Sequence, residues 1–229
     1  MRLRRRFWGS FFGLPEGLLG RVGARLMRRV SRPFSEAMSA VLELQPADDL
    51  LDVGCGSAGL LVDHAAHVRY VAGLDASELQ VTMARKRLAD RIGSGTAEIV
   101  LADAAALPWD DGRFSVVTAV NVLKFVPDPG QALREMHRVL RPGGRVAVTL
   151  GEAEQVPASE TAAVANAWGE WQWSDAAARL AMEDAGFEDV TISVMPVFSK
   201  ALLARGAKSA ASAIEATDDA ADTAPVTAV

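Results

Sequence analysis

The sequence predicts an α/β fold in which helices cover both faces of a mainly parallel, doubly wound sheet. Between Asp49 and Leu150, short β-rich apolar segments alternate with segments of helical periodicity, an order typical of such sheets. The first β-rich segment runs into a glycine-rich turn, LLDVGCGSAGL at residues 50–60, and a carboxylate ends each of the first three segments. Ligands bind where parallel strands end, so these ends mark the expected site.

Each element follows from its own pattern. Runs rich in β-branched and apolar residues predict strands, whereas apolar residues every three or four positions predict helices. Proline and glycine clusters such as RPGG at 141–144 predict turns between them. The expected strands start near Asp49 and then cover residues 70–75, 97–102, 114–122, 145–150, 190–194 and 197–203, and the expected helices cover 34–44, 60–67, 77–91, 127–140 and 174–185.

Composition predicts one folded domain, residues 47–204, with an extension at each end. Half of the 229 residues are hydrophobic, and no run of about 18 apolar residues suggests a spanning helix. A single cysteine, Cys55, excludes an intrachain disulfide and suits a reducing compartment, so we expect a cytoplasmic protein. The tail, residues 205–229, holds mainly small and acidic residues without aromatics, and we expect it to be disordered.

Charge is divided unevenly along the chain. Residues 1–46 hold nine arginines and three glutamates, whereas the remainder holds 15 basic and 26 acidic residues. The acidic body argues against broad nucleic-acid binding. The basic, amphipathic segment 1–46 is interpreted as a helical extension that packs on the domain as a lid. A membrane-surface helix and a targeting signal remain alternatives.

The glycine turn favours a cationic ligand over a pyrophosphate. Its spacing, G-x-G-x-x-G at residues 54–59, also fits a dinucleotide fingerprint. However, Asp52 lies two positions before the first glycine, and its carboxylate would repel a pyrophosphate. S-adenosylmethionine (SAM) has no phosphate and carries an ammonium and a sulfonium group. We interpret Cys55, within the turn, as a packing residue rather than a nucleophile.

Asp75 is the second candidate. It ends the segment YVAGLD, 23 residues after Asp52, and in doubly wound folds an acidic residue about 20 residues beyond the turn binds ribose hydroxyls. The alternative is that Asp75 only caps the following helix, although Ser77 could serve as that cap.

Several motifs together resemble the class I SAM-dependent methyltransferases, in particular the small-molecule branch with the ubiquinone and menaquinone enzymes. They are LLDVGCGSAGL, GLDAS, DAAALPWDDGRFSVV, RVLRPGG and AGFEDV, in this order. The resemblance covers residues 48–203. It implies a Rossmann-like, seven-stranded sheet whose last strand is antiparallel.

The resemblance also implies a set of cofactor residues. The turn would surround the methionine part of SAM, Asp75 would bind the ribose, and Asp103 would accept from the adenine amino group. Two departures are Ala58, where the family usually has glycine, and Gln80, where it usually has methionine. The implied residues are Asp52, Gly54, Cys55, Gly56, Ala58, Asp75, Ala76, Gln80, Asp103, Ala104 and Asn121.

The acceptor is less defined. The sequence predicts transfer to a small-molecule or lipid-like acceptor, with Asn121 and Lys124 as candidates near it. Trp168, Trp171 and Trp173 either cover an acceptor or pack a loop. No metal site is expected, because His64 and His67 lack further ligands nearby in sequence.

Two other functions remain open from sequence. An NAD(P)-dependent oxidoreductase is compatible with the glycine spacing, although no Ser/Tyr/Lys or Cys/His set is evident and Tyr70 is the only tyrosine. A noncatalytic domain of the same fold, docking to a membrane or a partner through residues 1–30, is the third possibility.

Overall fold

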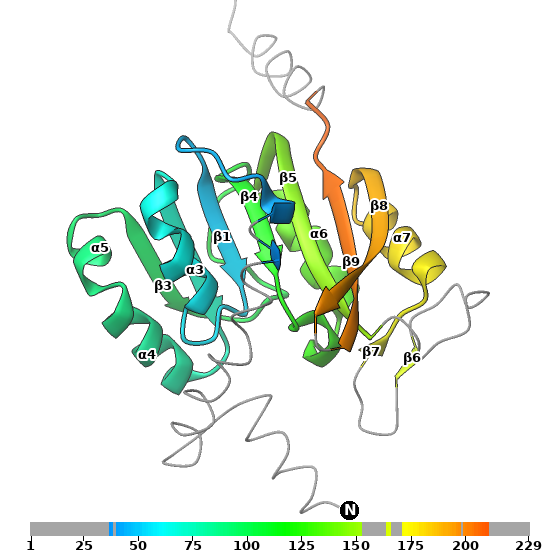
Figure 1. Ribbon diagram of the computed structural model, residues 1–229, viewed down its shortest axis with the longest axis horizontal. Coiled ribbons are helices and arrows are strands. Elements are labelled where there is room, and N and C mark those ends of the chain that lie inside the picture. Colours follow the sequence, from blue (N-terminus) through cyan, green and yellow to red (C-terminus); the bar gives the residue numbers. More distant parts are fainter. Residues whose placement is uncertain (1–36, 39, 153–163, 166–170, 198, 211–229) are drawn as a thin grey trace, which may run out of the picture.

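The computed structural model describes residues 37–38, 40–152, 164–165, 171–197 and 199–210. Seven strands form one sheet in the order β3-β2-β1-β4-β5-β9-β8, with helices on both faces (Figure 1). The strands β1 to β5 are parallel, and β9 is antiparallel to both β5 and β8. The predicted seven-stranded sheet with an antiparallel last strand is therefore confirmed.

The described elements match most of the expected ones. The sheet strands are β1 (Asp49–Val53), β2 (Tyr70–Asp75), β3 (Ala97–Leu101), β4 (Phe114–Ala119), β5 (Leu140–Glu152), β8 (Glu188–Val197) and β9 (Ser199–Ala207). The helices are α3 (Gly59–His64), α4 (Glu78–Arg87), α5 (Ala89–Gly93), α6 (Pro129–Val139) and α7 (Asp175–Asp184), with 3-10 turns η2 (Ala65–His67) and η3 (Leu123–Phe125), while β6 (Val164–Ala165) and β7 (Trp171–Gln172) form a small second sheet.

The sheet separates two apolar clusters. On one face, side chains of α6 and α7 such as Leu133 and Met182 pack with the strands. On the other face, α3, α4 and the helical residues 37–38 contribute Leu61, Val81 and Met38. Buried apolar area on both faces explains why the central strands read as continuous apolar runs rather than alternating ones.

Three expected boundaries differ from the structure. The predicted helix 77–91 is two helices, because Leu88 leaves helical geometry (φ −102°, ψ 17°). The predicted turn 141–144 lies within β5 as an irregular segment, where Gly143 has φ +72° and its N–H donates to the carbonyl of Lys208 at 2.9 Å. β9 continues to Ala207, so residues 205–207 belong to the sheet and not to the tail predicted for residues 205–229.

The amino ends of the strands carry a network of ion pairs. Asp48 accepts from Arg145 Nη2 at 2.6 Å and from Ser115 Oγ at 2.7 Å. Asp49 accepts from Arg69 Nε at 2.9 Å and Arg113 Nη1 at 3.1 Å. Burial acts to raise the pKa of both carboxyls, but these hydrogen bonds and arginine charges outweigh it and lower each pKa.

The expectations for the N-terminal segment lie mostly outside the described residues. Residues 37–38 and 40–42 are helical, as predicted for 34–44. None of the helices within the described ranges is long and apolar enough to cross a membrane.

Candidate active site

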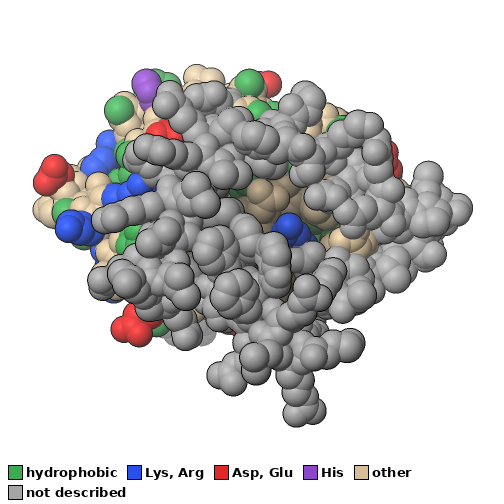
Figure 2. All heavy atoms as spheres, turned by 60° about the horizontal axis from the view of Figure 1, so that its bottom comes forward, with side chains coloured by type: hydrophobic (Ala, Val, Ile, Leu, Met, Phe, Trp, Pro, Cys, Tyr) green, Lys and Arg blue, Asp and Glu red, His purple; other side chains and the backbone are tan. Residues whose placement is uncertain are grey.

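The candidate site lies at the carboxyl ends of β1 to β4. β1 and β4 are neighbours in the sheet, and the chain proceeds from them in opposite directions, to β2 and to β5. Such a topological switch point leaves a crevice beyond the strand ends. Figure 2 views the molecule from the side of these strand ends, and a basic side chain is visible near the centre of this face.

The glycine turn follows β1 as predicted, but its first glycine is required for a different reason. Gly54 has φ +70°, and a Cβ there would lie 2.2 Å from Val122 Cγ2. Val122 therefore fills the space beside Gly54 that a Cβ would occupy. Gly56 (φ +53°) is open, since the nearest atoms to a Cβ would be those of the Gln80 amide at 4.0 Å. Gly56, and Gly59 with no atom within 4 Å of an added Cβ, therefore leave room beside the turn, whereas Gly54 does not.

Ala58 adopts the left-handed conformation that glycine usually fills. Its φ is 61° and ψ is 42°, and it is the N-cap of α3. The residue is fully buried and belongs to the cluster of α3 and α4. The additional methyl group thus packs into the core, which answers the concern that it would obstruct the cofactor.

Cys55 also faces the core. Its Sγ lies where a Cβ on Gly73 would approach to 2.8 Å, and its N–H donates to the carbonyl of Leu74 at 2.9 Å. Burial raises the pKa of the thiol well above its usual value, with the charges of Asp52 and Asp75 adding to the effect. A buried, protonated thiol agrees with a packing residue, so Cys55 can contribute to a ligand site only through its backbone.

Asp52 is a buried carboxyl group at the base of the turn. It is 4% exposed, and within the described residues no hydrogen bond to its side chain is found. Burial, and secondarily the charge of Asp75, raise its pKa to about 8. A carboxyl in this setting is protonated at neutral pH and becomes an anion most readily when a cation arrives.

Asp75 connects the turn to α4. Its Oδ2 accepts from the Gly56 N–H at 2.9 Å and its Oδ1 from the Ser77 N–H at 2.8 Å. Burial raises the pKa of Asp75, and these two bonds oppose the rise. The N-cap of α4 is Ser77, whose side chain accepts from the Gln80 N–H. The alternative that Asp75 is the cap is therefore wrong.

Four further predicted residues lie near Asp75 and the end of β3. Gln80 has a buried Oε1 without a hydrogen-bond partner, and such an orphan atom beside the open Gly56 suits a ligand that donates to it. Ala76 is exposed and next to Asp75. Asp103 is exposed and its Oδ1 accepts from the Ala105 N–H at 2.9 Å, while Ala104 is buried.

Asn121 and Lys124 follow β4. Asn121 has φ 58°, and its N–H donates to Thr149 Oγ1 at 2.7 Å, which joins the ends of β4 and β5. Lys124 lies in η3, with its Nζ 4.9 Å from the centre of the Phe125 ring. Sequence reasoning missed Thr149 and Val122, because their roles depend on contacts with residues at least 28 positions away.

Two tryptophans near this edge have structural partners. Trp171 Nε1 donates to the carbonyl of Val126 at 2.9 Å, and Trp173 is buried in the cluster of α6 and α7. Both pack rather than stand free, while Trp168 lies outside the described residues. Across the described ranges no group of three His, Cys, Asp or Glu side chains could hold a metal.

The fold and site together define a doubly wound α/β domain with a glycine turn, a buried Asp52, a half-buried Asp75 and an open Gly56 at its strand ends. Residues 51–148 match the family described as Methyltransferase domain. This matched stretch, which runs from β1 into β5, makes the chain similar to the class I SAM-dependent methyltransferases.

Individual relatives agree with this assignment. The chain is 35% identical over 153 residues to the 27-O-demethylrifamycin SV methyltransferase of Amycolatopsis mediterranei, covering 66% of this chain and 54% of the relative. It is 34% identical over 110 residues to a demethylmenaquinone methyltransferase of Listeria monocytogenes, covering 47% and 46%. The chain thus spans about half the length of these curated relatives.

The fold also has solved counterparts. A geranyl diphosphate C-methyltransferase from Streptomyces coelicolor aligns with a TM-score of 0.63 at 18% identity, over 87% of each chain. At this identity the comparison supports the fold.

Proposed function

We propose that this chain transfers a methyl group from SAM to a small-molecule or lipid-like acceptor. The observation that carries the proposal is the buried Asp52 at the root of the turn that holds the open Gly56. Within the described residues its side chain has no hydrogen bond, and its pKa is raised to about 8. A cationic ligand favours ionisation of this carboxyl, whereas an anionic pyrophosphate disfavours it. An NAD(P)-dependent reaction is therefore not favoured.

The cofactor residues divide along the ligand. Asp52 and the backbone of Gly54 to Gly56 would hold the methionine part. Asp75 would bind the ribose hydroxyls, and Gln80 Oε1 would gain a donor there. Asp103 would accept from the adenine amino group, with Ala104 against the ring. When bound, SAM supplies an electrophilic methyl group for in-line displacement.

The protein supplies alignment and exclusion of water. Asn121 and Lys124, at the end of β4, are the side chains that we place near the acceptor. Asn121 is held by its N–H bond to Thr149, which fixes its backbone in a left-handed conformation. Lys124 presents a cation over Phe125, and it would orient an acceptor oxygen and stabilise negative charge on it.

The acceptor class follows from the relatives. Those two proteins are named for a rifamycin and a menaquinone precursor, both large and partly apolar. Phe125, which is 40% exposed, offers an apolar contact at the same edge. We propose an acceptor of this kind.

The basic segment 1–46 would contribute in one of two ways. It would close over the site as a lid, or bind an anionic membrane from which an apolar acceptor is taken. Binding to vesicles with and without anionic lipid, before and after deletion of residues 1–12, separates these roles.

The test is incubation of the purified protein with methyl-labelled SAM and fractionated lipid and small-molecule extracts. We expect label in an organic-soluble product, and none with Asp75→Ala, which removes the ribose ligand. Tight binding of NADH without binding of SAM would contradict the proposal.

A further inference from the structure

The loop that carries Asp103 has no helix or strand of its own. Residues 102–113 connect β3 to β4, and Ala104 and Leu107 anchor it in the core. Asp103 itself is exposed. Residues outside the loop must therefore hold its backbone in position.

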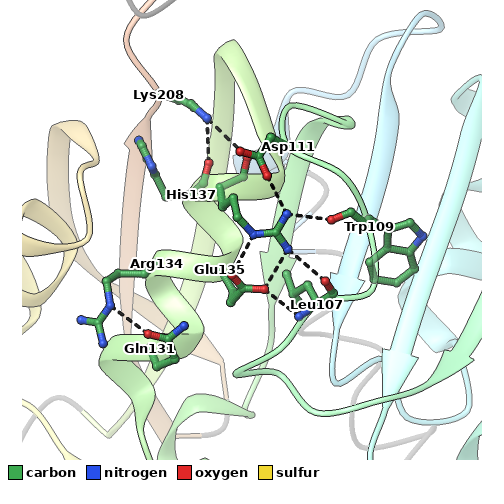
Figure 3. Close-up of polar contacts among 9 residues, drawn as sticks. Leu107, Trp109, Asp111, Gln131, Arg134, Glu135, His137 and Lys208 are labelled. Atoms are coloured by element: carbon green, nitrogen blue, oxygen red, sulfur yellow. Dashed lines mark hydrogen bonds and ion pairs between the residues drawn. The ribbon is translucent and has the colours of Figure 1, made fainter.

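The neighbouring helix α6 supplies that fixation. Glu135 Oε2 accepts from the Leu107 N–H at 2.8 Å. Arg138 donates to the carbonyls of Leu107 and Trp109 at 2.9 and 2.8 Å. It also donates to Asp111 Oδ1 at 2.8 Å. Figure 3 shows the three loop residues gathered against the helix.

The two helix residues are themselves held rigidly. Arg138 donates to both carboxylate oxygens of Glu135, each at 2.8 Å, and a bidentate pair of this type is geometrically specific. The Arg138 carbonyl accepts from the Gly112 N–H at 3.0 Å and from Lys208 Nζ at 3.4 Å. The pair with Glu135 therefore orients the guanidinium on the helix, and the Gly112 bond joins the loop to the helix backbone.

We propose that Arg138 and Glu135 are positioning residues for the cofactor: they hold the β3–β4 loop so that Asp103 and Ala104 meet the adenine ring. The inference rests on the proposed function. Asp103 lies four residues before Leu107, the nearest residue bound by the pair. Released from α6, the loop samples other positions, and the apparent affinity falls in proportion to the fraction that stays in place.

Arg138→Lys is the sharpest variant. Lysine keeps the charge but lacks the planar fork that reaches two carbonyls and two carboxylates together. Arg134→Lys is the matched control, because Arg134 lies on the same helix and its Nε donates to Gln131 of that helix at 3.0 Å (Figure 3).

The probes are S-adenosylhomocysteine and S-inosylhomocysteine, which has oxygen in place of the adenine amino group. Calorimetry on the full chain should show that the wild type prefers the adenosyl compound. We expect Arg138→Lys to lower the affinity for the adenosyl compound about tenfold, which corresponds to a loop that is in place in about one molecule of ten. The preference over the inosyl compound should shrink toward one, and Arg134→Lys should change neither value.

A general loss of stability would not alter the preference between the two probes. If Arg138→Lys bound the adenosyl compound with wild-type affinity and kept the wild-type preference over the inosyl compound, the role of Arg138 would be overturned. The proposed function would still stand in that case. If the wild type bound neither probe, the proposed function would fall with it. Should Arg138→Lys not fold, Glu135→Gln weakens the same clamp and is judged by the same two values.

Discussion

Asp52 shows how one side chain can couple ligand binding to pH. Its carboxyl is buried, close to Asp75, and has a pKa of about 8. The sequence places this residue before the glycines, but it does not show that the group is protonated at neutral pH. Burial and the partner carboxylate decide that, and both come from the packing of β1 against β2.

We expect SAM to bind more tightly as the pH rises toward about 8. The cation favours ionised Asp52, and below that pH ionisation requires release of a proton, so affinity changes by up to about tenfold per pH unit. Calorimetry between pH 6 and 8 measures this slope. Asp52→Asn should keep only the pH dependence of the ligand itself, and equal slopes in both proteins would count against the coupling.

Gly54 and Val122 form a second residue-scale test. Gly54→Ala introduces a Cβ 2.2 Å from Val122 Cγ2 at a φ of +70°, so we expect a loss of more than about 2 kcal/mol in unfolding free energy. Val122→Ala removes the clash but not the backbone strain. In urea denaturation, Gly54→Ala should therefore cost less in the Val122→Ala background. Additive effects would show that the two residues are independent.

At the scale of elements, α6 links the loop, the sheet and the end of β9. Its N-cap Asp128 accepts from the Gln131 N–H at 2.9 Å, and Pro129 occupies the first turn. The sequence predicted this helix well, because prolines mark its start and its apolar residues share one face. The clamp on the loop could not be predicted, since it depends on the loop returning beside residues about 30 positions later.

We expect Asp128→Ala to lower the unfolding free energy by about 1 kcal/mol, because one N–H of the first turn loses its acceptor. Asp128→Asn should retain most of the stability, as asparagine caps equally well. Thermal or urea unfolding of the two variants provides the comparison. The cap hypothesis fails if alanine and asparagine are equivalent.

Local sequence signals predicted some of the other element boundaries correctly and missed others. The strand 70–75 was predicted to the residue, because its apolar run ends in a charged group. The break at Leu88 and the irregular course of residues 141–144 were missed. Both depend on distant partners, such as Lys208 pairing with Gly143.

For the molecule as a whole, opposite ends of the sheet carry carboxyls with opposite pKa shifts. Asp48 and Asp49 at the amino ends have lowered pKa values, so the stability they provide is present above the unfolded pKa and lost as the pH falls through the folded value. Asp52 at the carboxyl end has a raised pKa, so its contribution is present below the unfolded pKa of 3.8 and lost as the pH rises to about 8.

We therefore expect ligand-free protein to be most stable in mildly acidic solution. In urea denaturation, Asp49→Asn should be less stable than wild type at pH 6, with the difference shrinking toward pH 2. Asp52→Asn should lose less stability than wild type between pH 5 and 8. The exposed Asp110→Asn serves as a control, and a pH profile unchanged by all three substitutions would contradict this account.

The α/β fold class and the placement of Asp52 and Asp75 at strand ends could be predicted from sequence, because the alternation of elements and the acidic strand ends are local signals. The acceptor could not. Asn121 and Lys124 indicate an edge of the sheet, but the shape of an acceptor pocket depends on how segments far apart in the chain meet.

The position of β9 has a consequence for synthesis on the ribosome. This strand is the last to be translated, yet it lies between β5 and β8. Until residue 207 has left the exit tunnel, β5 exposes unpaired backbone along its length and β8 has no neighbour. The nascent chain therefore passes through a stage with an open sheet edge, when chaperones have most reason to bind it.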